Sequence, residues 1–167
     1  MSDAVELDGS FGEGGGQILR TALTLSALTG RPLIVNDIRA RRDKPGLRPQ
    51  HLAVVRSIAQ ICGARLAGDE LDSSTLTFEP SSLPIAGQYT FDVSQMAGTG
   101  SAGSATLLFQ ALFVALACAD QPSTLRLIGG THVAFSPPYH FIAEVYLPFM
   151  WRMGFEVRLD LGIWGWY

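Results

Sequence analysis

A glycine loop near the N-terminus, Gly12-Glu13-Gly14-Gly15-Gly16-Gln17, has the residue types of a phosphate site. It lies between a predicted strand and a predicted helix. Glycines let the backbone approach a ligand closely, and a helix N-terminus offers free N–H groups and a partial positive charge. The loop is not a GxGxxG motif, because residue 17 is Gln, and not a P-loop, because no Gly-Lys-Ser/Thr follows. It predicts either a phosphate cradle or a tight strand-to-helix turn.

Two charged residues accompany this loop. The Glu13 carboxylate would either neutralise the helix N-terminus or hold a divalent metal that bridges to phosphate oxygens. Arg20 lies one turn into the predicted helix. It is either a phosphate ligand beside the loop or a solvated helix arginine. Position alone leaves both alternatives open for each residue.

The segment Arg39–Arg48 is the strongest local signal. It holds four Arg and one Lys within ten residues, although the formal net charge of the chain is -3. Pro45, Gly46 and Pro49 restrict the turn, and guanidinium forks on a rigid turn suit phosphate recognition. The alternative is a merely soluble loop. His51, just after this segment, is predicted to make a hydrogen bond at a helix start rather than to catalyse.

Other chemistry is weakly indicated. Gln110 stands alone in an apolar helix, as either a satisfied core amide or a ligand contact. His132 and His140 have no carboxylate partner by spacing, so neither is predicted to be an acid or base. No catalytic triad and no zinc-binding cysteine pattern stands out. Aromatic residues are not interleaved with the basic segment, so no base-stacking platform is predicted there.

Composition narrows the class of protein. The chain has 167 residues, of which 47% are apolar and 16% charged, so it buries a core rather than remaining disordered. The N-terminus has no signal-peptide pattern, from which we expect a cytoplasmic protein. The uncharged run Ala105–Cys118 is short for a bilayer, so no membrane contact is expected.

The order of predicted elements repeats with a period of roughly 80 residues, which predicts an α+β fold. Each of two β-α-β-α-β-β units is expected to form a four-stranded sheet covered by two helices on one face. The first unit is placed at residues 1–82 and the second at residues 85–167, with the last strand incomplete. The predicted strands are 5–8, 32–38, 64–67, 75–79, 88–93, 123–128, 155–161 and 163–167. The predicted helices are 17–28, 50–62, a stretch ending at 118 after the loop Ala97–Ser104, and 139–153.

The last residues are Trp-Gly-Trp-Tyr, which end mid-strand in this prediction. An unpaired strand edge with exposed aromatic residues binds other chains readily. We therefore expect a truncated chain or a partner, with pairing through the unfinished strand or a homo-oligomer as alternatives.

Several runs of sequence resemble the RNA 3'-terminal phosphate cyclase family. The runs occur in a consistent order and cover essentially the whole chain. They are Leu7–Arg20, Ile38–Leu47 with Gln50-His51-Leu52, Ser101–Gln110, and Gly129–Thr131 with Ser136–Pro138. The resemblance implies a truncated form of the cyclase and enolpyruvyl-transferase-like fold, in which such units are repeated and a smaller domain is inserted. The third repeat and the inserted domain are expected to be absent.

The resemblance also implies an activity. Such ligase-type enzymes use ATP to attach AMP to a histidine and then to an RNA 3'-phosphate, after which the 2'-hydroxyl closes a 2',3'-cyclic phosphate. It implies Glu13 as a ligand of Mg or Mn. It assigns to ATP the residues Gly14, Gly15, Arg20, Gln110 and Pro137, and to the phosphate of the RNA 3' end the residues Arg39, Arg42, Lys44 and Gln50.

This sequence departs from the family in ways that limit the inference. Relatives are about twice as long, and no histidine here matches the nucleophilic one, so the chain alone is expected to be inactive. Ser94–Gly100 resembles a small insertion. The alternatives are a non-catalytic cyclase-like factor in RNA processing or ribosome assembly, and an enolpyruvyl-transferase-like enzyme. The presence of Glu13, Arg42 and Gln110 favours the cyclase.

Overall fold

The computed structural model describes residues 4–96 and 103–166 and has a mixed α+β fold. The first predicted unit is confirmed in its order of elements. Its strands are β1 (Val5–Asp8), β2 (Leu33–Asn36), β3 (Arg65–Ala67) and β4 (Leu76–Glu79), and its helices are α1 (Gly16–Thr29) and α2 (Pro49–Cys62). The sheet has the order β1-β2-β4-β3, with β1 parallel to β2 and β4 antiparallel to both of its neighbours.

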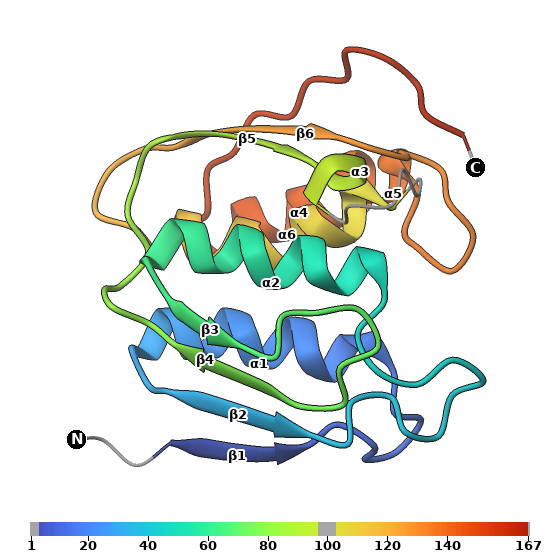
Figure 1. The fold of residues 1–167 in the computed structure, drawn as a ribbon. Coiled ribbons are helices and arrows are strands. Elements are labelled where there is room, and N and C mark those ends of the chain that lie inside the picture. Colours follow the sequence, from blue (N-terminus) through green and yellow to red (C-terminus); the bar gives the residue numbers. More distant parts are fainter. Residues whose placement is uncertain (1–3, 97–102, 167) are drawn as a thin grey trace.

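Both helices of this unit cover the same face of the sheet (Figure 1). Each ends at a glycine in the left-handed region, Gly30 (φ 67°) and Gly63 (φ 61°), where a residue with a Cβ would be strained. Phe78 of β4 is fully buried between the sheet and the helices. Because burial of a side chain of this size contributes about 2–3 kcal/mol, the packed face outweighs the weak intrinsic preference of short helices.

The second unit departs from the prediction of a four-stranded sheet. Its described strands are only β5 (Gln88–Asp92) and β6 (Thr124–Ile128), which pair in parallel. The residues 155–161 are not a strand. Phe155, Val157 and Leu159 alternate with exposed residues, as the sequence suggested, but they pack against the side chains of a helical cluster instead of flanking a ladder. An alternating pattern indicates which side chains are buried. A strand requires, in addition, a neighbouring strand with which its backbone forms hydrogen bonds.

The predicted last strand is reduced to one isolated bridge, between His132 and Trp166. The Thr131 N–H donates to the Gly165 carbonyl oxygen at 2.8 Å. In the first unit the Ile38 N–H donates to the Ser74 carbonyl oxygen at 2.9 Å, just where β4 begins. The bridge at Trp166 is parallel, however, whereas β4 is antiparallel to β2, so the segment 163–166 does not reproduce the fourth strand of the first unit. Pairing of this segment with a partner stays a prediction.

The helices of the second unit are irregular. The predicted helix 139–153 is built from α5 (Tyr139–Phe141), a π-helical turn η1 (Ile142–Tyr146) and α6 (Leu147–Arg152). Pro148 has no N–H to donate to residue 144, and the Leu147 N–H reaches back five residues to the Ile142 carbonyl, which widens the turn. A short helix α3 (Val93–Met96) was not predicted. The apolar helix α4 runs over Ala105–Ala117, while residues 97–102 of the loop expected before it lie outside the described part.

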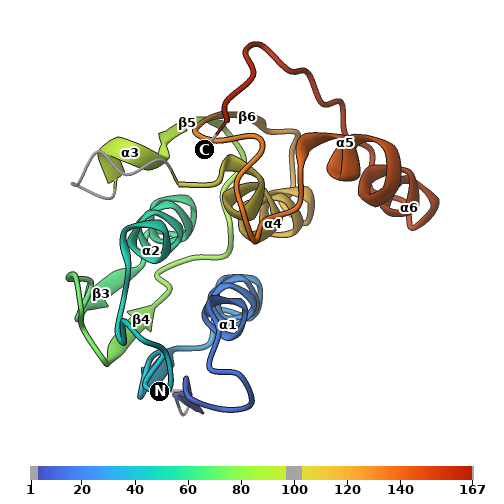
Figure 2. The same cartoon turned by 90° about the vertical axis from the view of Figure 1, so that its right-hand side faces the viewer.

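The helices α1, α2 and α4 lie between the two sheets (Figures 1 and 2). One cluster of buried side chains draws on these three helices and on both sheets, so the two units share a core; the boundaries 1–82 and 85–167 stay a prediction. The N-termini of α1, α2 and α4 and the carboxyl ends of β1, β2, β5 and β6 lie at one edge, on the right in Figure 1. Within residues 4–96 and 103–166, no helix is long and apolar enough to cross a bilayer.

Candidate phosphate site at the helix N-termini

The glycine loop leaves the start of α1 open. Gly12 (φ 60°) and Gly14 (φ 58°) take the left-handed conformation, and the loop is closed by the Gly14 N–H, which donates to the Phe11 carbonyl oxygen at 3.0 Å. Gly15 caps the helix without a side-chain hydrogen bond, and the first turn carries no acidic residue. The free N–H groups and the partial positive charge of the helix N-terminus are therefore available to an anion.

Arg42 lies against this loop. Its Nη2 is 3.5 Å from Glu13 Oε2, and a Cβ placed on Gly15 would stand 3.2 Å from the same nitrogen. The side chain of Glu13 is 94% exposed and that of Arg42 is 42% exposed. An ion pair with this much water around it contributes little to stability, about 0–1 kcal/mol. Both groups therefore remain free to exchange this contact for a ligand.

His51 of α2 packs beneath the first turn of α1. A Cβ on Gly16 would collide with the His51 ring and would stand 3.1 Å from Arg20 Nη1, so this close approach requires glycine. His51 is 2% exposed, and its Nδ1 accepts a hydrogen bond from the Arg48 N–H at 3.0 Å. This bond places the ring proton on Nε2. The prediction of a hydrogen-bonding residue at the helix start is confirmed.

Positive charges surround His51, and of these the charge of Arg48 is paired with the Asp72 carboxylate. Burial, followed by the charges of Arg39, Arg20 and Arg48, lowers the pKa of His51 to about 3. The pKa of Arg39 is also lowered, by burial first and then by Arg42 and Arg48. Groups that disfavour each other's positive charge in this way would be stabilised by an anion among them. We call Arg20, Arg39, Arg42 and Arg48 the arginine cluster.

Arg20 and Arg39 are held by different means. Arg20 Nη2 donates to Gln17 Oε1 at 2.9 Å, whereas its buried Nε has no hydrogen-bond partner among the described residues. Burial lowers the pKa of Arg20. Arg39 has a positive φ of 56°, and its Nη1 donates to the carbonyl oxygens of Lys44 (2.6 Å) and Gly46 (3.2 Å). Arg39 thus shapes the basic loop from within.

Arg48 is a member of the arginine cluster to which the sequence assigned no role of its own. It precedes α2, forms an ion pair with Asp72 and donates its N–H to His51. A Cβ on Gly46 would collide with the backbone of Asp72, so the basic loop lies directly on the turn before β4. The available sequence signal was the position of Arg48 immediately before the helix start at Pro49.

Not every predicted ligand joins this group. Lys44 is exposed, and its contact with the cluster is made by its carbonyl oxygen rather than its ammonium group. Gln50 is exposed in the first turn of α2, and a Cβ on Gly103 would stand 3.8 Å from its Cβ. Gln50 therefore lies where the first unit meets the entry to α4.

Gln110 of α4 and Pro137 of the loop before α5 form a second group, linked through Thr106. The Thr106 hydroxyl donates to the Pro137 carbonyl oxygen at 2.6 Å, and Gln110 follows Thr106 by one helical turn on the same face. The Gln110 side chain is half-buried. Thr24 of α1 donates to the Ala111 carbonyl oxygen at 2.9 Å, which ties α4 to the helix of the glycine loop.

A divalent metal would find one carboxylate here. Among residues 4–96 and 103–166 no group of three His, Cys, Asp or Glu side chains could hold a metal ion. Glu13 therefore fits a metal only if phosphate oxygens and water supply the other ligands. Mg²⁺ is commonly bound in this way, by one or two carboxylates together with a substrate phosphate.

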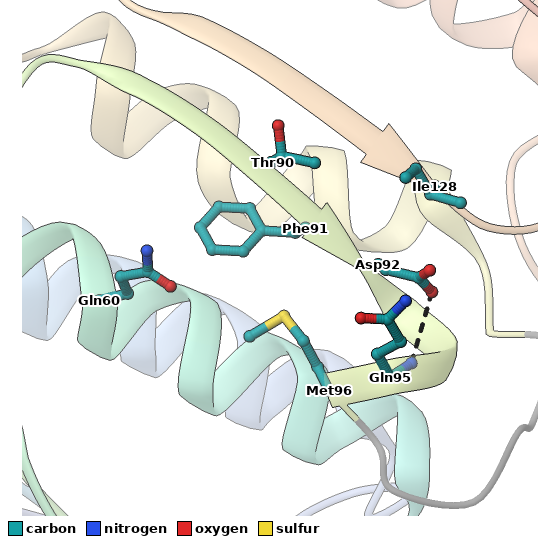
Figure 3. Close-up of a pocket in the computed structure, with 7 residues that line it drawn as sticks. All are labelled: Gln60, Thr90, Phe91, Asp92, Gln95, Met96 and Ile128. Atoms are coloured by element: carbon teal, nitrogen blue, oxygen red, sulfur yellow. Dashed lines mark hydrogen bonds between the residues drawn. The ribbon is translucent and has the colours of Figure 1, made fainter.

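A separate pocket between α2 and β5 contains none of the predicted site residues (Figure 3). The Asp92 carboxylate in it accepts from the Ser94 N–H and hydroxyl and from the Gln95 N–H, which makes it the cap of α3. The hydrogen bonds of Ser94 lower the pKa of Asp92. The pocket is lined by Gln60, Thr90, Phe91, Asp92, Gln95, Met96 and Ile128.

The fold and the site together define a class, a mixed α+β protein with an arginine cluster beside a helix N-terminus. The model of the family described as RNA 3'-terminal phosphate cyclase matches residues 11–167, and the chain belongs to this family. It is 53% identical over 163 residues to the RNA 3'-terminal phosphate cyclase of Gloeothece citriformis and 50% identical over 163 residues to that of Methylococcus capsulatus. These matches cover 98% of this chain but 47% and 45% of the two relatives, so the chain spans about half of their length.

Proposed function

We propose that this chain supplies the phosphate-holding part of an RNA 3'-terminal phosphate cyclase, which closes an RNA 3'-phosphate into a 2',3'-cyclic phosphate at the expense of ATP. The observation that carries the proposal is the arginine cluster around the open N-terminus of α1, where burial and neighbouring arginines lower the pKa values of Arg39 and His51. Both relatives compared above are named RNA 3'-terminal phosphate cyclase, which supports the proposal.

In this proposal the residues share the binding of two phosphate-bearing substrates. Gly14, Gly15 and the first N–H groups of α1 bind a phosphate, and the charge of Arg20 neutralises it from the adjacent helical turn. Arg39 and Arg42 hold the phosphate of the RNA end, with Gln50 and Lys44 at the margin. Gln110 on α4 and Pro137 in the loop before α5 form the wall against which the nucleotide lies. Glu13 would hold Mg or Mn, which would supply positive charge to the phosphate oxygens when bound.

The reacting group that carries AMP is proposed to be a histidine outside these 167 residues. His51 cannot take this role while it is buried, neutral and bonded to the Arg48 N–H. We therefore expect the 167-residue chain alone to bind phosphate or nucleotide weakly and to form no covalent adduct with AMP.

The binding step is tested with a short labelled oligoribonucleotide that ends in either a 3'-phosphate or a 3'-hydroxyl. We expect the chain to prefer the 3'-phosphate, and Arg42→Ala to weaken that binding roughly 10- to 100-fold, as for the loss of a charge-assisted hydrogen bond. Arg65→Ala is the matched control, because Arg65 is exposed, is paired with Glu79 and carries the same charge. Equal affinity for both ends, or equal losses in both variants, would contradict a phosphate site here.

The catalytic step is tested on a full-length protein that contains this sequence. Labelled ATP is expected to leave an acid-labile protein–AMP adduct, and the same protein is expected to convert the 3'-phosphate of the oligoribonucleotide to a cyclic phosphate. Absence of the adduct with retained RNA binding would point to a non-catalytic relative.

A further inference from the structure

Four aromatic rings from distant parts of the chain meet beside the loop that follows β6. His132 stacks on Trp166 with ring centroids 4.3 Å apart and planes 26° from parallel. His140 stacks on Trp164 at 5.2 Å and 25°, and the two tryptophan rings are 6.4 Å apart and 23° from parallel. We call these four residues the aromatic cluster.

Backbone and buried side-chain contacts hold this cluster in place. Thr131 is 9% exposed, and its hydroxyl oxygen accepts from the Gly165 N–H at 3.1 Å and lies 2.9 Å from His132 Nδ1. A Cβ on Gly165 would stand 2.9 Å from the Gly129 carbonyl oxygen, so the two segments approach as closely as glycine allows. His132 Nε2 and His140 Nδ1 are 3.4 Å apart.

The cluster is nevertheless open to solvent. Trp164 is 47% exposed and Trp166 is 72% exposed. Phe135, in the loop between the two histidines, is fully exposed and has a positive φ of 59°, a conformation that is strained for a residue with a Cβ. Large exposed rings with polar edges suit planar partners, because every nucleobase has a π-face that stacks on them.

The position of the cluster agrees with such a partner. The loop after β6 and the end of the described chain lie on the face turned to the viewer in Figure 2, as do the glycine loop and the basic segment. A nucleotide ligand needs both kinds of surface, cations for its phosphates and a flat apolar surface for its base. The arginine cluster has the chemistry of the first surface and the aromatic cluster that of the second.

We propose that His132, His140, Trp164 and Trp166 form a stacking site for a nucleobase, supplied either by the RNA strand or by ATP. The proposal rests on the proposed function, because a protein that acts on RNA ends with ATP meets nucleobases from both sources. The site orders the ligand by stacking and leaves the phosphate to the arginines, so the two contributions can be separated by mutation.

The test uses the intrinsic fluorescence of the tryptophans. Trp151 is the only other tryptophan of the sequence and lies on α6, so Trp151→Phe leaves Trp164 and Trp166 as the reporters. This variant is titrated with ATP, with inorganic tripolyphosphate, and with a single-stranded oligoribonucleotide ending in a 3'-phosphate. Quenching by a base-bearing ligand, and not by tripolyphosphate, is expected.

Affinity is then compared among variants. Replacing both Trp164 and Trp166 by Ala is expected to weaken the binding of the base-bearing ligand roughly 5- to 150-fold and to leave the binding of tripolyphosphate unchanged. Replacing both by Phe is expected to retain most of the affinity. Trp151→Ala is the matched control, an exposed tryptophan outside the cluster, and should change neither. A loss confined to RNA assigns the base to the RNA strand, and a loss confined to ATP assigns it to adenine.

The stacking site is overturned if the Ala variant binds both base-bearing ligands as tightly as the parent does. It is also overturned if the variant loses affinity for tripolyphosphate as much as for the base-bearing ligands. Failure of the proposed function looks different. In that case Arg42→Ala leaves the preference for a 3'-phosphate unchanged or the preference is absent, while the base-dependent quenching can still be measured.

Discussion

The two units of this molecule begin alike and end differently. Each has a parallel pair of strands and a helix packed on them, β1 and β2 with α1, and β5 and β6 with α4. In the first unit β4 then inserts between β2 and β3 and pairs with both. In the second, residues 155–161 stay extended but unpaired. A sheet of this order depends on its last strand, because the third strand has no other neighbour.

The loops at the site edge also differ in chemistry. The loop after β2 carries the guanidinium groups of Arg39, Arg42 and Arg48. The corresponding loop after β6 carries His132 and Phe135 and leads to His140 in α5. One unit thus concentrates positive charge at a helix N-terminus, and the other presents flat rings. We propose that the same scaffold position serves two kinds of recognition, and the following predictions test how far this division holds.

The largest effect is expected from truncating the core of the first sheet. Phe78→Ala removes a fully buried ring from β4, while Phe155→Ala removes a half-buried ring from the unpaired segment. Urea unfolding should show a loss of about 3–5 kcal/mol for Phe78→Ala and of about 1 kcal/mol or less for Phe155→Ala. Equal losses would mean that the second unit is as firmly packed as the first.

The next effect is the pH dependence that His51 imposes on the first unit. Its pKa of about 3 in the folded chain lies below the ordinary 6.5, so the unfolded chain binds the extra proton and acid favours unfolding. Between about pH 6 and pH 4 the free energy of unfolding should fall by about 1.4 kcal/mol per pH unit through this group. His51→Asn keeps an acceptor for the Arg48 N–H and should remove that part of the slope, as measured by urea unfolding at several pH values. An unchanged slope would place the titrating group elsewhere.

The close packing of the glycine loop against His51 predicts a smaller loss of stability. Gly16→Ala forces a methyl group against the His51 ring and should destabilise the chain by about 1–3 kcal/mol, with weaker binding of inorganic tripolyphosphate in calorimetry. Gly162→Ala in the second unit meets nothing within 4 Å and should stay within about 0.5 kcal/mol of the parent. If Gly16→Ala were equally neutral, the loop would not lie on His51 as described.

The smallest effect concerns the hydrogen bond that holds the loop after β6 against α4. Thr106→Val deletes the hydrogen bond to the Pro137 carbonyl oxygen while keeping the side-chain shape. A loss of about 0.5–1.5 kcal/mol is expected, seen as a decrease of roughly 2–4 °C per kcal/mol in the melting temperature. Thr124→Val, at an exposed position of β6, is the control and should leave the melting temperature nearly unchanged. The same decrease in both variants would argue against the anchor.

Local patterns predicted much of the fold. Glycines at 30 and 63 marked the ends of α1 and α2, and the alternation of residues 5–8 and 75–79 marked strands that the structure confirms within a residue or two. Local patterns were less informative for the two cysteines, which both follow apolar runs of sequence: Cys62 is buried, whereas Cys118 is exposed at the end of α4. An apolar run of sequence does not determine whether a residue at the end of a helix faces the core or the solvent.

The sequence by itself determined that a glycine loop and a basic segment would flank helix N-termini, because glycine conformation, proline rigidity and charge act over a few residues. Only the tertiary structure decided that His51 closes the floor of the site, that Arg48 joins the arginine cluster, and that Lys44 stays outside it. It alone brought Trp164 and Trp166 onto His140 and His132, across more than twenty residues of intervening chain. Such contacts depend on how elements pack and on which strand edges find partners, and neither is a property of a local stretch of sequence.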